Sequence, residues 1–245
     1  MDRIFEQELT FGFNQCDAHK NASFSQLLSV TSEAAGDDFT VQGFSWDYLQ
    51  TIHICMLVSR LSFKLYKIPR ENQKVKIKTW EEKARALQCM RRYDLYDAQT
   101  DELLLTGLSS WLIVDPETRR IQKPSVFTAR PLPEKETPFD GIDCGKIHHS
   151  ENEKVLDERL IRFSDIDANG HVNNSRYGDF FADALPKEFH EKTVTDFRLN
   201  YAKECREGDV LKIFGEVSED NTKITMTAKI EASDEICFEA EAFFK

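Results

Sequence analysis

The sequence predicts an α+β protein built from two tandem units, each an antiparallel sheet wrapped around a central helix. Two observations lead to this fold class. Each half of the chain places a helix with one apolar face ahead of a run of alternating strands. A proline-rich stretch divides the chain near its middle, because five of the seven prolines lie between Pro116 and Pro138. We therefore expect the two sheets to pair as a pseudo-dimer within one chain.

The composition favours a globular protein without a nucleic-acid or membrane partner. Hydrophobic residues make up 40% of the 245 residues, and the formal net charge of −11 opposes general binding to phosphate backbones. No apolar run reaches the ~18 residues of a membrane helix, and the N-terminus lacks the features of a signal peptide, so we expect a cytoplasmic protein. The six cysteines form no C-x-x-C pair, which favours reduced thiols over disulfides or a zinc site.

The first half begins with a short strand at residues 6–13, followed by a helix that Ser23 is placed to cap. One face of this helix is apolar or small, with Phe24, Leu27, Leu28, Thr31, Ala34 and Ala35. Alternation and β-branched or aromatic content then predict strands at 52–66, 74–80, 87–96 and 103–114. This order predicts a helix packed against an antiparallel meander.

The second half repeats this order of elements. A strand at 159–164 precedes a polar loop, and Asn173 or Asn174 is the expected N-cap of a helix with an apolar stripe of Tyr177, Phe180, Phe181, Ala184 and Leu185. Strands follow at 193–201, 210–217, 223–230 and 236–244. Pro69 and Glu204, like Val75 and Val210, are 135 residues apart, which suggests equivalent positions. We expect a unit at 1–115, a linker at 116–154 and a second unit at 155–245.

The polar loop first invites comparison with a calcium-binding loop. Asp165, Asp167, Asn169 and Gly170 match the opening of an EF-hand, but its twelfth position is the cation Arg176, where a bidentate Glu is required. The preceding residues also alternate like a strand rather than a helix. Calcium is therefore disfavoured, Asp165 is expected to be structural, and a purely structural turn remains the alternative. The following helix N-terminus could stabilise developing negative charge.

Four stretches of the sequence resemble one family. The run D-x-N-x-H-V-N-N-x-x-Y, residues 167–177, resembles the motif of hotdog-fold thioesterases. Residues 65–69, 109–120 and 201–206 resemble a Tyr-Pro segment, the end of the first repeat and the Glu-Cys site of fatty acyl-ACP thioesterases of plants and bacteria. The resemblance covers nearly the whole chain and implies two tandem hotdog units. The chain starts almost at once with a strand, where plant members carry a transit peptide, which favours a bacterial member.

The resemblance also implies an activity and its residues. It implies hydrolysis of the thioester that joins a fatty acyl group to the phosphopantetheine arm of acyl carrier protein, without a metal or other cofactor. The functional residues fall in the second unit, while the first unit forms much of the acyl pocket. They are Asp167, Asn169, His171 and Glu204, with Cys205 beside them.

Two mechanisms are open for these residues. In the first, Glu204 activates water, Asn169 and His171 orient that water or bind the carbonyl oxygen, and Asp167 holds both in place. Burial among apolar residues would raise the pKa of Glu204 towards the value that suits a general base. In the second, Cys205 is the nucleophile, with His171 as base and Asn169 as the orienting group.

An acidic enzyme needs a local basic face to attract acidic acyl carrier protein. The candidates are Lys83, Arg85, Arg91 and Arg92, or Lys64, Lys67 and Arg70, although solvated strand faces would explain the same charges. Alternative functions are an acyl-CoA thioesterase of the same fold, a non-catalytic acyl-thioester-binding protein and a hotdog dehydratase. A homodimer is also considered.

Overall fold

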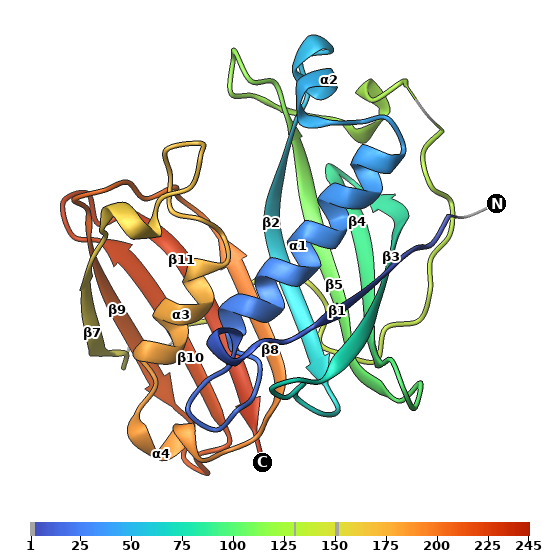
Figure 1. Cartoon of the computed structure of the whole chain (residues 1–245). Coiled ribbons are helices and arrows are strands. Elements are labelled where there is room, and N and C mark those ends of the chain that lie inside the picture. Colours follow the sequence, from blue (N-terminus) through green and yellow to red (C-terminus); the bar gives the residue numbers. More distant parts are fainter. Residues whose placement is uncertain (1–2, 130, 150–151) are drawn as a thin grey trace.

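The chain folds around one antiparallel sheet, which confirms the expected α+β class (Figure 1). The computed structural model describes residues 3–129, 131–149 and 152–245. Within these residues the sheet has eleven strands, and β6 (Ile121–Gln122) pairs with β5 beside the main path. The main path runs in the order β1 (Phe5–Thr10), β3 (Lys74–Arg85), β4 (Gln88–Asp97), β5 (Leu103–Val114), β2 (Cys55–Leu65), β8 (Val194–Tyr201), β11 (Ile236–Phe244), β10 (Lys223–Ile230), β9 (Val210–Val217) and β7 (Lys154–Leu160).

The two halves meet at β2 and β8, in the middle of the strand order. These strands pair antiparallel from Arg60 opposite Asn200 to Lys64 opposite Asp196. Figure 1 shows α1 (Phe24–Val41) crossing the half formed by β1 to β5, and α3 (Arg176–Asp183) crossing the other half. The expected pairing of two sheets into a pseudo-dimer is therefore confirmed.

Helix α1 is capped and buried as its sequence predicts. Ser23 Oγ accepts a hydrogen bond from the backbone N–H of Gln26 at 3.3 Å, which satisfies one of the free donors of the first turn. The face that turns towards the sheet is buried at Leu27, Leu28, Thr31, Ala34 and Ala35. The helix thereby supplies the core of the first half.

The two helices are in close contact at Gly178 of α3. A Cβ atom at this position would lie 2.6 Å from Ser25 N and 2.7 Å from Phe24 C, both backbone atoms of α1. We expect Gly178→Ala to lower the free energy of unfolding by roughly 2 kcal/mol, because a backbone cannot yield as a side chain can. Urea denaturation measures this difference.

Gly36 provides the matched control for this substitution. It is also helical, but an added Cβ would meet no atom within 4 Å. Gly36→Ala should therefore stabilise the protein by about 0.5 kcal/mol, because alanine has less freedom to lose in a helix. A Gly178→Ala variant as stable as the wild type would contradict the close helix contact.

Helix α3 buries the stripe that its sequence predicts but starts later than expected. The helical residues begin at Arg176, and Ser175, which precedes them, makes no side-chain cap hydrogen bond. Asn173 Oδ1 instead accepts from Ser175 N at 2.9 Å and from Ser175 Oγ at 2.8 Å, so its side chain closes a turn just before the helix. The stripe is buried at Tyr177, Phe180, Phe181, Ala184 and Leu185.

The chain before each helix folds into the same loop. In the first half, Asp17 N–H donates to Asn21 O at 2.8 Å, and Lys20 N–H donates to Asp17 O at 3.0 Å. In the second half the corresponding bonds join Asp167 N to His171 O and Gly170 N to Asp167 O. The left-handed residue of this turn is Lys20, with φ 64°, in one half and Gly170, with φ 78°, in the other. The backbone repeats, whereas the side chains do not.

Equivalent backbone bonds correct the expected separation of 135 residues. Ala22 N–H donates to Pro69 O at 2.7 Å, and Val172 N–H donates to Cys205 O at 3.0 Å. Pro69 is therefore the counterpart of Cys205, a separation of 136 residues. Glu204 consequently has Ile68 as its counterpart, so the first half lacks a carboxylate at this position.

Several expected elements differ in their bounds from the structure. The strand expected at 6–13 ends at Thr10, the one expected at 52–66 begins at Cys55, and the one expected at 74–80 continues to Arg85. A strand was predicted at 159–164, but β7 ends at Leu160. The chain then turns into the 3-10 helix η3 (Phe163–Asp165), where the Asp165 carboxylate accepts the backbone N–H of Arg162. A short helix, α2 (Trp46–Thr51), was not expected and lies near the start of β2. The remaining short helices are η1 (Phe13–Gln15), η2 (Pro124–Val126) and α4 (Lys187–His190).

The connection between the halves runs along the surface of the protein, as the sequence suggested, and it contacts the sheet. Three backbone carbonyls of this segment accept hydrogen bonds from side chains of β2, β4 and β8. They join Ser62 Oγ to Ile142 O, Arg92 Nη1 to Pro138 O at 3.1 Å and Asn200 Nδ2 to Gly145 O at 3.2 Å. Residues 130, 150 and 151 of the expected linker lie outside the described residues. The segment thereby covers polar side chains of the sheet.

Among the described helices, none combines the length and the apolar content that crossing a membrane requires.

Candidate active site

A tight loop between η3 and α3 carries three of the predicted site residues. The Asp167 carboxylate accepts a hydrogen bond from the backbone N–H of Asn169 at 2.8 Å, as in an Asx turn. The backbone N–H of Asp167 donates to His171 O at 2.9 Å. Gly170 provides the positive φ that closes the turn. Asp167 thus forms hydrogen bonds with backbone groups of the loop. Asn169 and His171 line a cavity.

Glu204 lies beside this loop because a backbone hydrogen bond joins the two segments. The bond from Val172 N to Cys205 O places His171 next to Glu204. His171 Nε2 and Glu204 Oε2 are 3.1 Å apart. The imidazole and the carboxylate therefore approach each other directly at the cavity. The structure therefore brings together two residues that are far apart in the sequence.

A cation from the first half also reaches Glu204. Arg119 Nη1 lies 3.6 Å from Glu204 Oε2, although the Arg119 side chain is 65% exposed. Arg119 occupies the turn after β5, where the Asp115 carboxylate accepts the N–H groups of Glu117 and Thr118 at 3.0 and 2.8 Å. This turn fixes the backbone from which Arg119 extends. Both halves of the chain thus contribute to the site.

Glu204 is only partly buried, a property that the sequence left open. Its side chain is 44% exposed, compared with 19% for His171. Glu204 follows β8 in an irregular segment at the rim of the cavity, so its carboxylate keeps contact with solvent.

Cys205 points into the core instead of the cavity. Its exposed fraction is 0%, and its thiol donates to Cys237 Sγ at 2.7 Å. Cys237 in turn donates to the Tyr177 hydroxyl at 3.6 Å. The hydrogen bond between Cys237 and Cys205 and burial both raise the pKa of the Cys237 thiol, and burial raises that of the Tyr177 hydroxyl. The surroundings of Cys205 are those of a packed thiol.

The cavity at the loop has a volume of about 620 Å³ and lies between the two halves. Its wall includes Asp167, Asn169, His171 and Glu204, whereas Cys205 does not line it. Another thiol, Cys55, does line the cavity, but burial raises its pKa, so the reactive thiolate is disfavoured. The first half contributes residues from α2, β2, β5 and the turn around Arg119.

A second cavity, of about 540 Å³, lies beneath α1 and shares part of its wall with the first. Trp46, Met56 and Trp111 line both. The second cavity extends from β2 across β5 and β4 to β3, and no residue of the loop between η3 and α3 lines it. On β4 it reaches Arg91, whose Nη2 lies 3.0 Å from Asp38 Oδ2 of α1. A largely apolar cavity, with charged side chains in its wall, thus adjoins the site.

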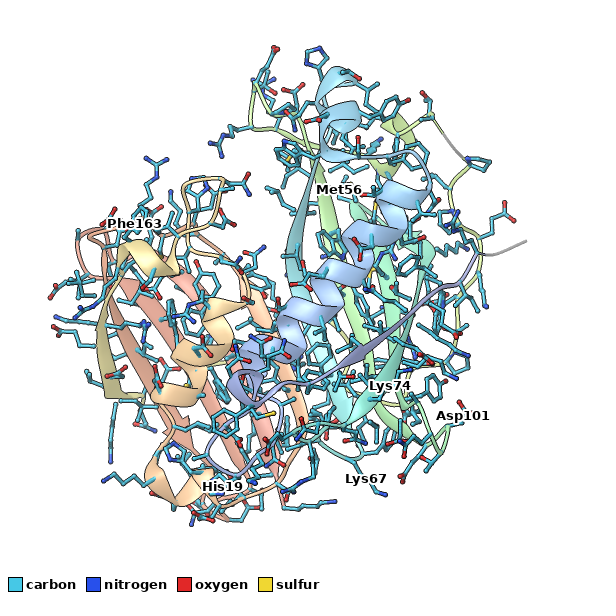
Figure 2. All side chains as sticks on the ribbon, in the orientation of Figure 1. His19, Met56, Lys67, Lys74, Asp101 and Phe163 are labelled. Atoms are coloured by element: carbon cyan, nitrogen blue, oxygen red, sulfur yellow. The ribbon has the colours of Figure 1, made fainter. Side chains whose placement is uncertain are left out.

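The first basic cluster suggested by the sequence is wrong. Arg91 and Arg92 are buried, with 3% and 4% exposed, because Arg91 pairs with Asp38 and Arg92 lies under the segment 131–149. The second cluster lies elsewhere. Figure 2 shows Lys67 at the end of the molecule opposite Met56, and its Nζ lies 2.5 Å from Glu102 Oε1. Neither cluster surrounds the cavity mouth.

Asp165 serves as a structural anchor of the loop. Its side chain is 1% exposed and lies 3.3 Å from Arg159 Nη2 and 3.1 Å from Arg176 Nη2. Burial alone would raise the pKa of Asp165, but the backbone N–H of Arg162 and the two guanidinium groups together lower it below its usual value. The residue that most suggested calcium is therefore bound by two arginines.

Sequence reasoning missed α2 and Arg119 as parts of the site. Trp46 and Gln50 of α2 line the cavity beside the catalytic loop. Ser45 was the available signal, because its Oγ accepts from Tyr48 N at 3.3 Å and caps this helix. Arg119 carried no local signal for its contact with Glu204, which depends on the packing of the two halves.

Solved structures share this arrangement across the whole chain. An acyl-ACP thioesterase from Bacteroides thetaiotaomicron superposes with a TM-score of 0.88 at 23% identity, covering 99% of this chain and 98% of that one. A 12:0-ACP thioesterase from Umbellularia californica gives a TM-score of 0.85 at 18% identity, covering 99% and 94%. The fold is therefore the double hotdog of acyl-ACP thioesterases, in which two helix-wrapping sheets pair.

The sequence itself defines the family. The family profile of the acyl-ACP thioesterase N-terminal domain matches residues 2–125, and that of the C-terminal domain matches residues 148–245. The chain belongs to the acyl-ACP thioesterase family. It is 29% identical over 234 residues to the chloroplastic oleoyl-acyl carrier protein thioesterase of Coriandrum sativum and 24% identical over 239 residues to a palmitoyl counterpart of Gossypium hirsutum. The matches cover 85% and 90% of this chain, but 62% and 56% of those relatives.

Proposed function

We propose that this protein hydrolyses the thioester between a fatty acyl group and the phosphopantetheine arm of acyl carrier protein. The observation that carries the proposal is the contact of His171 with Glu204, 3.1 Å apart, in a cavity that adjoins a second, largely apolar cavity. A thioester needs both features, because water must be activated at its carbonyl while the alkyl chain leaves solvent. The membership of the acyl-ACP thioesterase family supports the same substrate class.

In the proposed reaction Glu204 takes a proton from water as the water oxygen bonds to the thioester carbon. Asn169 binds the carbonyl oxygen, and His171 orients the water together with Glu204. The carbon–sulfur bond then breaks, and the thiol leaves with the proton that Glu204 accepted. The products are a free fatty acid and the carrier thiol. The partial exposure of Glu204 keeps it accessible to water.

Several observations favour activated water over a cysteine nucleophile. The Cys205 thiol is fully buried and hydrogen-bonded to Cys237, so a thioester carbonyl in the cavity would not reach its sulfur without rearrangement. The Glu204 carboxylate lines the cavity directly. We therefore assign Cys205 a packing role and the hydrogen bond from Val172 to its backbone carbonyl a positioning role.

We further propose that residues 155–245 form the catalytic unit and residues 1–115 hold the acyl chain, joined by residues 116–154. The acyl chain would pass Trp46, Met56 and Trp111 into the cavity beneath α1. The far end of the bound acyl chain would lie near Arg91, because the buried ion pair of Arg91 with Asp38 offers no apolar contact to a longer chain.

For acyl carrier protein we propose docking around the cavity mouth. Arg119 and Lys203 line the cavity, and Arg206 follows Glu204 by two residues. Arg206 forms no ion pair with a described residue, so its charge is available to an acidic partner. Acyl-CoA is the alternative substrate, because its phosphopantetheine arm would enter the same cavity.

The test is hydrolysis of a ladder of saturated acyl chains, octanoyl to stearoyl, on acyl carrier protein and on coenzyme A. We expect release of free fatty acid with a higher kcat/KM for the carrier-protein substrates. Arg206→Glu should lower kcat/KM for acyl-ACP by about tenfold at low salt, and less at high salt, because it reverses a steering charge.

Lys154→Glu is the matched control, since Lys154 is an exposed cation on the edge strand β7. It should leave both substrate classes unchanged. Equal losses of acyl-ACP and acyl-CoA hydrolysis in Arg206→Glu would argue against carrier-protein docking at this position. A wild-type protein that releases acid from neither class would refute the proposed function.

A further inference from the structure

Gln50 presents a buried amide nitrogen that no group of the described chain satisfies. The Nε2 atom is fully buried and has no hydrogen-bond partner within the part of the chain that the structure describes. Gln50 also lines the catalytic cavity, whose wall includes Asn169, His171 and Glu204. A buried donor without an acceptor is costly, so such groups usually have a bound partner. The cavity is where a partner would enter.

Gln50 differs in this respect from the other described side chains with an unpaired buried polar atom. These are Arg92 Nε, Ser110 Oγ and Arg159 Nε, and none of their residues lines either cavity. Arg92 and Arg159 also satisfy other nitrogens of their guanidinium groups. The unpaired donor of Gln50 therefore coincides with a space that a ligand could fill.

Helix α2 holds Gln50 in place and sets its position in the cavity wall. Leu49, the preceding residue, is buried in a small cluster with Ile54, Ile113 and Phe127. Trp46 lies one turn earlier on the same helix face and lines both cavities. Met56, labelled in Figure 2 near α2, also lines both. Gln50 thus lines the cavity of the candidate site one helical turn from Trp46, at which the two cavities share a wall.

We propose that the Gln50 amide donates a hydrogen bond to an oxygen carried by the first carbons of the acyl group. This inference rests on the proposed thioesterase function and extends it. Two acceptors share the required chemistry: the thioester carbonyl, and an oxo or hydroxyl oxygen on the third carbon of the chain. A site built around a buried donor discriminates against substrates that lack the acceptor, because the donor then stays unpaired.

The test compares wild type and Gln50→Leu on decanoyl, 3-oxodecanoyl and 3-hydroxydecanoyl acyl carrier protein. Leucine keeps a similar volume without polar atoms. We expect kcat/KM to fall about tenfold, the loss of one hydrogen bond, for substrates whose oxygen Gln50 binds. An equal fall for all three identifies the thioester carbonyl, and a fall confined to the two oxygenated chains identifies the oxygen on the third carbon.

A structural role is separated from a binding role by stability. Because the amide is unpaired in the free protein, Gln50→Leu should unfold at the same temperature as wild type or higher. Gln99→Leu, at an exposed position in a loop away from both cavities, is the matched control and should change no rate. Rates of Gln50→Leu within twofold of wild type on all three substrates would overturn the proposal.

Failure of the proposed function gives a different result. A wild-type protein that hydrolyses none of the three substrates would refute the thioesterase activity. The role of Gln50 would then be tested by ligand binding. In that case 3-hydroxydecanoic acid, which carries acceptor oxygens at both candidate positions, should raise the unfolding temperature of wild type more than that of Gln50→Leu. Equal shifts for the two proteins would overturn the inference.

Discussion

Replacing Glu204 by glutamine is expected to lower kcat for acyl-ACP hydrolysis by about 100-fold or more, the usual contribution of a general base. Glutamine keeps the size of the side chain and its place at the cavity rim, but its amide does not accept a proton from water. Steady-state release of free fatty acid measures the effect. Because Glu204 is 44% exposed, the substitution should change the free energy of unfolding by less than about 1 kcal/mol.

Cys205→Ala is the comparison that separates the two mechanisms. The thiol is buried against Cys237, so its removal should cost about 1 kcal/mol of stability while kcat stays within a few-fold of wild type. If Cys205→Ala lost nearly all turnover and Glu204→Gln retained it, the water mechanism would be wrong. Substitution of His171 would not distinguish the two, because both mechanisms use it.

Local pattern was sufficient to predict most of the sheet and both main helices. Strand β11 alternates between an inward face with Phe238, Ala240 and Ala242, all fully buried, and an opposite face with Glu239 and Glu241. Such alternation arises because successive side chains of a strand point to opposite sides. The predicted bounds of β5, β9, β10 and β11 agree with the structure for the same reason. The α+β class follows from these elements alone.

Features that depend on contacts between distant segments could not be predicted in this way. The sequence predicted that Arg91 and Arg92 belong to a basic surface, because charged residues are usually exposed. In the structure both are buried, Arg91 against Asp38 and Arg92 under the segment 131–149. The exposure of Glu204 and its contact with Arg119 depend likewise on how the two halves pack. The sequence did bring Asp167, Asn169, His171 and Glu204 into one hypothesis, and the structure places all four at one cavity.

The loop that carries these residues depends on Asp165, and its removal should have the second large effect. Asp165→Ala leaves two guanidinium groups, of Arg159 and Arg176, without their buried partner. We expect the free energy of unfolding to fall by roughly 3 kcal/mol at neutral pH, as when one member of a buried pair is lost. Chemical denaturation of both proteins across pH measures the difference. We also expect kcat to fall, because the Asp165 carboxylate accepts the backbone N–H of Arg162 at 3.0 Å and its removal would loosen the turn that leads into the loop.

The pH dependence of this difference follows from the lowered pKa of Asp165. Its folded pKa lies below the value of 3.8 that applies to the unfolded chain, so the ionised carboxylate stabilises the fold at all pH values above that. As pH falls below about 4 the unfolded chain binds a proton first, and the stabilisation is lost as pH falls through the folded pKa. The gap between wild type and Asp165→Ala should therefore be constant from neutral pH to about pH 5 and narrow below it. Asp183→Ala serves as the control, because Asp183 contacts the same Arg159 but is 58% exposed and should change stability by less than about 1 kcal/mol. A gap that stayed constant down to pH ~2 would show that the ionised carboxylate does not anchor the loop.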